Sequence, residues 1–223
     1  MKIALIGSTG FVGRAVLEEA LARGHAVVAL VRDPAKLAAR SGLTVVKADA
    51  YDAAAVAGAV KGADAVISAF NPGWSDPEIA PKFTVGAHAI DAGVRASGVK
   101  RVLVVGGAGS LFVAPGVQLV DTPEFPAFIR AAASAARDLH SDYVAGRCGA
   151  GLDWTFVSPP AGFGPHDPNA DAPRTGAYRL GGDAVMFAGA APATISRADL
   201  AAAILDEIET PKHVRARFTV AAV

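Results

Sequence analysis

The sequence predicts a single α/β domain: a doubly wound parallel sheet with a layer of helices on each face, three layers in all. Through the first half of the chain, short apolar runs alternate with longer helical stretches, which is the pattern of parallel strands buried on both faces. The length of 223 residues fits one domain. Hydrophobic residues make up 52% of the chain and charged residues 19%, which is enough apolar surface for a sizeable core.

Five predicted strands and the helices between them account for the first half. The strands are expected at residues 3–6, 26–31, 43–46, 64–68 and 101–105, and the helices at 11–22, 53–60 and 79–96. Asp52 and Asp33 are predicted N-caps, of the second long helix and of a short helix that starts at Pro34, because a short polar side chain accepts hydrogen bonds from helix N–H groups. Right-handed crossovers between consecutive strands then give the doubly wound order.

The second half is less regular. We expect a long loop at 106–123, a helix at 124–147, a sixth strand at 154–157, a loop at 159–176, a short strand at 177–180, a helix at 197–208 and a last strand at 218–220. The sequence shows no internal repeat and no low-complexity linker. These elements therefore complete the same domain.

Charge and cysteine content exclude several classes of protein. Lys plus Arg and Asp plus Glu each total 21, so no net field attracts nucleic acid or an anionic membrane. One cysteine, Cys148, rules out an internal disulfide, and the spacing of the histidines predicts no metal site. The uncharged stretch 102–120 has the length of a membrane span, but its glycines and Pro115 indicate a strand that runs into a loop. We expect a cytoplasmic protein without nucleic-acid or membrane partners.

The strongest motif is a glycine-rich turn between the first strand and the first helix. It reads Gly7, Ser8, Thr9, Gly10, Phe11, Val12 and Gly13. One glycine permits the tight turn, a second lets backbone approach a pyrophosphate, and the third lets helix and strand pack closely. N–H groups at the helix start then bind the phosphates. In this strand–loop–helix context the motif predicts a Rossmann-like dinucleotide site formed by these seven residues.

The ends of the second and third strands refine the expected cofactor. Arg32 stands where an arginine accommodates the 2′-phosphate of NADP, so we expect NADP(H) to be favoured over NAD(H). Asp33 is an alternative contact to the ribose. Asp49 and Ala50 follow the third strand, and there Asp49 either accepts from the adenine amino group or shares helix capping with Asp52. The sequence leaves both roles open.

The remaining strand ends predict where the rest of the ligand lies, because ligands of such folds bind beyond the carboxyl ends of the strands. The expected cofactor contacts there are Ala69, Phe70, Asn71, Gly106, Gly107 and Pro159. Loops 106–123 and 159–180 are expected to form the wall of an acceptor pocket. Three aromatic residues are its candidate stacking contacts: Trp74, Phe163 and Tyr178.

Together these segments resemble the atypical short-chain dehydrogenase/reductase family of NAD(P)H-dependent flavin reductases and biliverdin-IXβ reductase-like proteins. The resemblance covers nearly the whole chain and is carried by the glycine motif, Val31-Arg32-Asp33, Asp64-Ala65-Val66-Ile67, Gly151-Leu152-Asp153-Trp154-Thr155-Phe156 with Pro159-Pro160, and Thr175-Gly176-Ala177-Tyr178. Bacterial proteins described as NADH-flavin reductases end their fifth strand in a similar Gly-Gly-Ala-Gly-Ser. The resemblance implies hydride transfer to a flavin such as FMN or FAD, or to a quinone.

The chain departs from most short-chain dehydrogenases in its catalytic residues. The usual Tyr-x-x-x-Lys pair is represented only by Tyr143-x-x-x-Arg147, and arginine is a poor stand-in for lysine. Ser110 lies late after the fifth strand, and His166 lies in a predicted loop. These three residues are weak catalytic candidates, so the catalytic residues are not assigned.

Three functions remain compatible with this pattern. Reduction of a small planar acceptor is the first, because hydride transfer to a flavin or quinone takes its proton from water and depends on positioning. The second is an NADP(H)-binding sensor without turnover, as in NmrA-like proteins. The third is a nucleotide-sugar epimerase or dehydratase, which the missing Tyr-x-x-x-Lys pair disfavours. A small-molecule acceptor is the expected partner, and the chain is expected to be a monomer or a homodimer.

Overall fold

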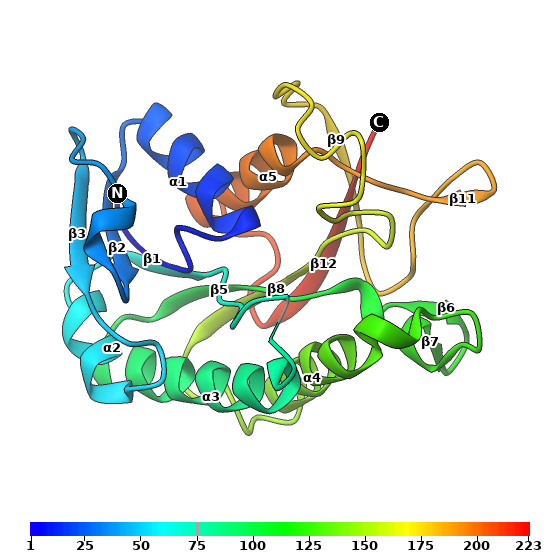
Figure 1. The fold of residues 1–223 in the computed structure, drawn as a ribbon, viewed down its shortest axis with the longest axis horizontal. Coiled ribbons are helices and arrows are strands. Elements are labelled where there is room, and N and C mark those ends of the chain that lie inside the picture. The colour runs from blue at the N-terminus through cyan, green and yellow to red at the C-terminus, as the bar shows by residue number, and fades with distance from the viewer. Residues whose placement is uncertain (75) are drawn as a thin grey trace.

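The central sheet places the carboxyl ends of its parallel strands along one edge. In the computed structural model, which describes residues 1–74 and 76–223, the strand order is β3-β2-β1-β4-β5-β8-β12-β9 (Figure 1). The strands are β1 (Lys2–Ile6), β2 (Ala26–Val31), β3 (Leu43–Lys47), β4 (Ala65–Ser68), β5 (Arg101–Val105), β8 (Asp153–Ser158), β12 (Ala216–Ala222) and β9 (Tyr178–Gly181). All neighbours pair in parallel except β12 and β9. The order reverses beside β1, which is the switch point where ligands of doubly wound sheets bind.

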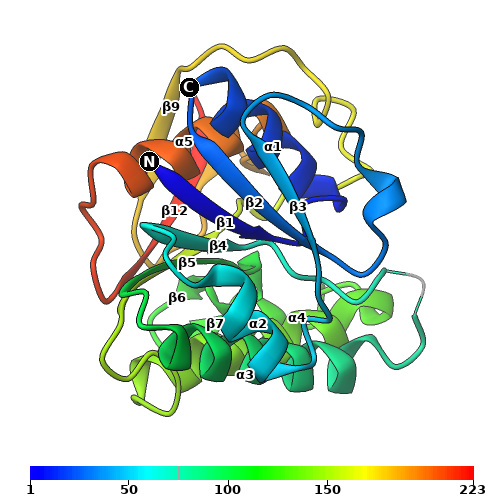
Figure 2. The same ribbon diagram turned by 90° about the vertical axis from the view of Figure 1, so that its left-hand side faces the viewer.

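Helices cover both faces of the sheet (Figures 1 and 2). On one face lie α1 (Phe11–Ala22) and α5 (Arg197–Glu209), and on the other lie α2 (Ala53–Val60), α3 (Ile79–Ser97) and α4 (Ala127–Val144). Alternate residues of β1 enter the two hydrophobic cores, with Ala4 in the core under α2–α4 and Leu5 in the core under α1 and α5. The predicted three-layer, doubly wound domain is confirmed. Within the described residues, no helix combines the length and hydropathy needed to cross a bilayer.

Local chemistry explains the boundaries of the first helices. Asp52 caps α2 by accepting from the N–H groups of Ala54 and Ala55 at 2.9 and 3.1 Å. Asp33 caps the short 3-10 helix η1 (Pro34–Lys36) in the same way, and α3 ends at Gly98 in the left-handed region. Both N-caps are as the sequence predicts.

The predicted loop at 106–123 is instead partly ordered. It contains the short helices η2 (Ala108–Ser110) and η3 (Leu119–Asp121) and the hairpin of β6 (Phe112–Ala114) and β7 (Val117–Gln118). A second hairpin, β10 (Phe187–Ala188) with β11 (Ala191–Pro192), is also absent from the prediction.

Helix α4 is shorter than the predicted span 124–147. It begins after Pro126, because a residue that precedes proline is pushed out of the helical region and Phe125 therefore cannot extend the helix. Its far end is set by Gly146, whose φ is +72°. Proline and glycine thus trim three residues at each end.

Candidate functional site

The turn between β1 and α1 requires glycine at two positions. Gly7 has a φ of +84°, and a Cβ there would overlap the carbonyl oxygen of Ala69 in the neighbouring strand end. A Cβ on Gly13 would overlap the carbonyl oxygen of Gly7. Gly10 is different: it is exposed, its φ is −79°, and a Cβ would lie 3.2 Å from the Gly7 oxygen. Gly7 and Gly13 therefore serve the fold. A side chain at Gly10 meets no φ strain and one close contact, to the Gly7 carbonyl oxygen, which must shift by a few tenths of an ångström.

The first turn of α1 keeps its hydrogen-bonding capacity for a ligand. Gly10 is the N-cap and offers no side-chain cap, and the first turn carries no acidic residue. The hydroxyl of Ser8, buried in the same loop, has no hydrogen-bond partner among the described residues. A helix start bears free N–H groups and a partial positive charge. The loop therefore fits a phosphate group.

A cavity of about 90 Å³ opens beside this loop at the carboxyl ends of β1 to β4. Its lining residues are Ile6, Gly7, Thr9, Leu30, Val31, Arg32, Ala48, Asp49, Ala50, Tyr51, Phe70, Asn71 and Pro72. The structure thus brings together residues that the sequence analysis took from four separate strand ends. The cavity lies where a dinucleotide's adenosine half binds in folds of this order.

Arg32 is the free cation of this cavity. It is exposed, and no hydrogen bond or ion pair holds its guanidinium among residues 1–74 and 76–223. One carboxylate oxygen of the adjacent Asp33 is engaged by the N–H of Ala35 at 3.1 Å. A guanidinium with unused donors suits a phosphate.

Asp49 and Tyr51 line the cavity from the turn after β3. Asp49 accepts from the N–H of Tyr51 at 3.1 Å, while Asp52 alone caps α2. The shared-cap role for Asp49 is therefore wrong, and the contact to adenine stays a prediction. Burial raises the pKa of Tyr51, whose ring meets Phe70 edge-on with centroids 5.7 Å apart. Sequence reasoning missed Tyr51, although its place directly after Asp49-Ala50 was a usable indication.

The ends of β5 and β8 continue the same edge. The N–H of Gly106 donates to the carbonyl of Val157 at 2.9 Å, and a Cβ on Gly106 would overlap the ring of Phe156. Gly107 starts η2, and Pro159 is buried directly after β8. All three residues follow a strand at the carboxyl edge of the sheet, and their contacts to a cofactor stay a prediction.

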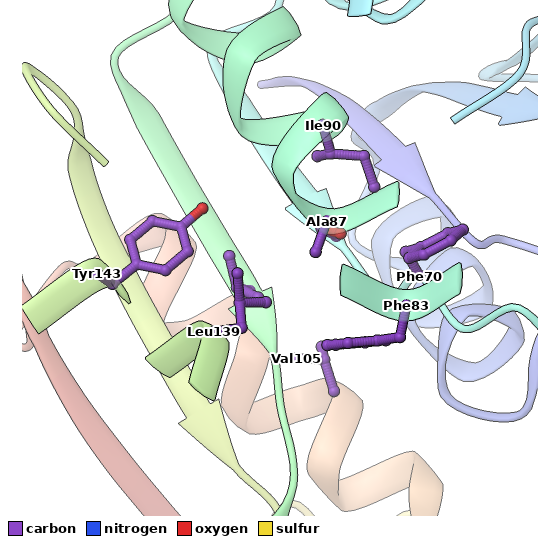
Figure 3. Close-up of a pocket in the computed structure, with 9 residues that line it drawn as sticks. Phe70, Phe83, Ala87, Ile90, Val105, Leu139 and Tyr143 are labelled. Carbon is purple, nitrogen blue, oxygen red and sulfur yellow. The ribbon is translucent and has the colours of Figure 1, made fainter. Parts of the chain in front are cut away.

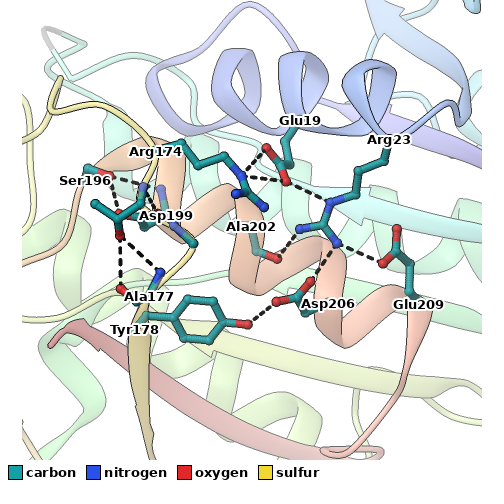
Figure 4. A network of polar contacts seen from close by, with 12 residues as sticks. Glu19, Arg23, Arg174, Ala177, Tyr178, Ser196, Asp199, Ala202, Asp206 and Glu209 are labelled. Atoms are coloured by element: carbon teal, nitrogen blue, oxygen red, sulfur yellow. Dashed lines mark hydrogen bonds and ion pairs between the residues drawn. The ribbon is translucent and has the colours of Figure 1, made fainter.

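The three aromatic candidates for the acceptor pocket do not lie together. Phe163 packs on Phe11, the first residue of α1, with ring centroids 5.4 Å apart. Trp74 is 60% exposed in the loop after β4. Tyr178 instead donates its hydroxyl to Asp206 of α5, beside Arg23 at the far end of α1 (Figure 4). The glycine loop lies at the opposite end of α1 from this network. Tyr178 therefore does not line an acceptor pocket beside that loop, and its predicted role as a stacking contact is wrong.

Tyr143 is a core residue and not an exposed acid. It is 4% exposed and packs against Trp154 and Phe156, with centroid distances of 5.3 and 6.3 Å. Burial raises the pKa of Tyr143 well above its ordinary value, and the nearby charge of Asp91 adds to this. The ring borders a cavity of about 10 Å³ between α3, α4 and the sheet (Figure 3). That volume holds about one water molecule.

The other two catalytic candidates are also apart. Ser110 is 1% exposed, and both its hydroxyl and its carbonyl accept from Arg217 of β12, at 2.8 and 3.0 Å. His166 is exposed in the loop after β8. No acid–base pair therefore forms from Ser110, Tyr143 and His166 in this structure.

Comparison with known proteins agrees with this geometry. A family model described as NAD(P)H-binding matches residues 7–211. An uncharacterized Bacillus subtilis protein, YwnB, is 36% identical over 225 residues, which span 99% of this chain and 98% of that protein.

Two solved structures cover the whole chain. One, from Bacteroides thetaiotaomicron and described as a "putative epimerase", is 43% identical, with a TM-score of 0.89 over 100% of this chain and 97% of that chain. The other, from Streptococcus pneumoniae and described as a "putative NADH-flavin reductase", is 32% identical, with a TM-score of 0.83 over 100% of both chains. With its glycine loop, strand order and matched residues, the chain belongs to the NAD(P)H-binding family, as a Rossmann-like member of the atypical short-chain dehydrogenase/reductase group.

Proposed function

We propose that this protein is an NADPH-dependent reductase of a small planar acceptor, a flavin or a quinone. The observation that carries the proposal is the uncapped start of α1 beside a cavity that contains the unpaired Arg32. The residues present fit the cofactor: the glycine loop for the pyrophosphate, Arg32 for the 2′-phosphate and Asp49 for the adenine amino group. Bound NADPH supplies a hydride to the acceptor.

In this reaction the chain itself holds the cofactor and orients the acceptor against it. Ala69 and Gly106 present backbone along the carboxyl edge, which lets a flat ring system lie close to the strand ends. Phe163, whose ring is tilted by 42° against that of Phe11, supplies an aromatic surface beside the start of α1. Since no acid–base pair forms among the candidates, water supplies the proton. Positioning alone accounts for large rate effects in reactions of this kind. The Streptococcus pneumoniae structure described as a "putative NADH-flavin reductase" supports this acceptor class.

Replacement of Arg32 by alanine is expected to abolish the preference for NADPH over NADH. One lost charge-assisted contact to phosphate is worth about 1.5–3 kcal/mol. That corresponds to roughly ten- to a hundredfold in affinity. Titrating both cofactors against wild type and Arg32→Ala measures the effect, and Arg40→Ala, which removes a surface arginine paired with Glu18, is the matched control. Equal wild-type affinities for the two cofactors would refute the role of Arg32.

Tyr143→Phe is expected to leave turnover nearly unchanged, because Tyr143 is a buried core residue and phenylalanine keeps the packing of its ring against Trp154 and Phe156. Phe163→Ala and Trp74→Ala should instead raise the KM for the acceptor. Steady-state kinetics with FMN and with a quinone, at saturating NADPH, distinguish the two effects. A general acid contributes about 10²–10⁴-fold to a rate. A loss of that size in Tyr143→Phe at unchanged stability would restore a proton-donor mechanism.

A cofactor-binding sensor without turnover is the second candidate. It is favoured by one observation: Ser110 is bound by Arg217 and Tyr143 is buried in the core, so the two do not form an acid–base pair at the site. The same observation weighs against epimerase or dehydratase chemistry, which needs a positioned acid or base. The two candidates differ in one measurable property, which is oxidation of bound NADPH by an added acceptor.

A further inference from the structure

Away from the cofactor site, a mixed set of metal-binding side chains converges between α3 and α4. His88 comes from α3, Asp142 from the last turn of α4, and Cys148 from the turn that follows. One nitrogen, one oxygen and one sulfur atom of these residues all lie within 4.8 Å of one another. We propose that they bind a divalent cation of the zinc type. Sulfur and imidazole ligands favour zinc over magnesium or calcium.

The carboxylate of Asp142 is oriented for this role. Its Oδ2 lies 2.8 Å from Nε2 of His88, while its Oδ1 accepts from Nε of Arg147 at 2.6 Å. One oxygen is thus held by Arg147 and the other by a hydrogen bond with His88, which a metal ion would have to replace. Zinc bonds of about 2.0–2.3 Å separate tetrahedral ligand atoms by roughly 3.3–3.8 Å. His88 is 48% exposed, so a small rotation of its side chain supplies the needed adjustment, and water completes the coordination.

The sulfur ligand is positioned by backbone that does not depend on a metal. The N–H groups of Arg147 and Cys148 both donate to the carbonyl of Asp142, at 2.8 and 3.1 Å. Gly149 follows with a φ of +72°, and its N–H donates to Asp91 at 2.8 Å. A Cβ at Gly149 would lie 2.6 Å from the Trp154 ring, so this turn is fixed against the core. A preformed turn lowers the entropy cost of metal binding.

Binding has a defined proton balance. Burial, followed by the charges of Asp91 and Asp142, raises the pKa of the Cys148 thiol to about 12, so the free protein carries S–H at neutral pH. On binding, the S–H bond breaks, a metal–sulfur bond forms, and the proton passes to the buffer. The thiolate and the Asp142 carboxylate then neutralise a dication. Metal sites that contain cysteine release protons in this way.

Zinc and cobalt titrations of the full chain, stripped of metal beforehand, test the site. Calorimetry with Zn²⁺ should give about one ion per chain, with an enthalpy that depends on the ionisation enthalpy of the buffer because a proton is released. Co²⁺ should give a thiolate-to-cobalt charge-transfer band. We expect Cys148→Ser to remove the band and His88→Gln to weaken binding at least tenfold, with His166→Gln, an exposed histidine elsewhere, as the unchanged control.

Two outcomes would overturn the proposal. The first is a wild-type protein that takes up cobalt without a charge-transfer band, which shows that the sulfur is not a ligand. The second is zinc affinity that His88→Gln and His166→Gln lower equally, which shows binding to surface histidines in general. Because His88 is half-exposed, its variant remains informative even if Cys148→Ser fails to fold. Neither readout involves NADPH, so failure here is independent of the proposed function.

Discussion

A Gly10→Val protein is expected to fold and to bind no NADPH. We expect the fold to accommodate a side chain at this exposed position, because φ is −79° and the one close contact of a Cβ, 3.2 Å to the Gly7 carbonyl oxygen, needs a shift of only a few tenths of an ångström. A branched side chain would, however, stand where a pyrophosphate must approach the backbone. Thermal unfolding with and without NADPH measures the effect. Ligand at a hundred times its Kd stabilises the native state by about 2.7 kcal/mol, and the variant should lose all of this.

Two other glycine substitutions are the matched controls. Gly13→Ala should destabilise the protein itself, since its Cβ would overlap the Gly7 carbonyl. Gly58→Ala, in α2 with nothing within 4 Å, should keep the NADPH response and be neutral or stabilising by up to about 1 kcal/mol. A Gly10→Val midpoint that still rises with NADPH would contradict the assignment of this loop.

His140→Gln is expected to make the free energy of unfolding less sensitive to acid between pH 6.5 and about 4. His140 lies on α4 with its ring 5.0 Å from that of Phe156. Burial lowers the pKa of His140 to about 4, and the Arg217 guanidinium adds to this while Asp183 opposes it. The native histidine therefore stays neutral well into the acid range.

The direction of this pH effect follows from the number of protons that the native and unfolded states bind. As the pH falls from 6.5 to about 4, the unfolded chain protonates at His140 and the native protein does not, so the free energy of unfolding decreases. Below about pH 4 both states are protonated and this loss ends. Urea unfolding across that range should show a smaller slope for His140→Gln and the full slope for His166→Gln. Identical slopes in wild type and His140→Gln would contradict the burial argument.

The first half of the fold was predictable because its determinants are local. The apolar run of β1, the glycine turn and the cap of α2 by Asp52 lie within a few residues of the elements they define. The residues of the proposed cofactor site could be brought together from the sequence, because the parallel strands of a doubly wound sheet place Arg32 and Asp49 at one edge. To predict this part of the site, it was enough to predict correctly where each strand ends.

In the second half the predicted strands and the helix at 197–208 agree with β8, β9, β12 and α5, but the hairpins and the direction of Tyr178 depended on contacts that the sequence does not reveal. The hairpin of β6 and β7 is tied down by pairing of Phe112 with Asp183 and Val185, far along the chain. Arg217 reinforces this by binding both Ser110 and Asp183. Because Tyr178 follows a predicted loop, the sequence indicated a residue of the acceptor pocket. A network of ion pairs and hydrogen bonds at α5 instead determines where its side chain points. Polar contacts between residues so far apart along the chain leave no periodic pattern in the sequence, so sequence analysis cannot predict them.

The most direct measurement of the central claim is a single turnover. The protein is loaded with a stoichiometric amount of NADPH and mixed without oxygen with FMN, FAD or a quinone, and the absorbance of the reduced nicotinamide is followed. We predict oxidation of the bound NADPH that is faster than in free solution with at least one acceptor and is lost in Gly10→Val. Tight NADPH binding with no faster oxidation by any of the three would contradict a reductase and leave the sensor as the function.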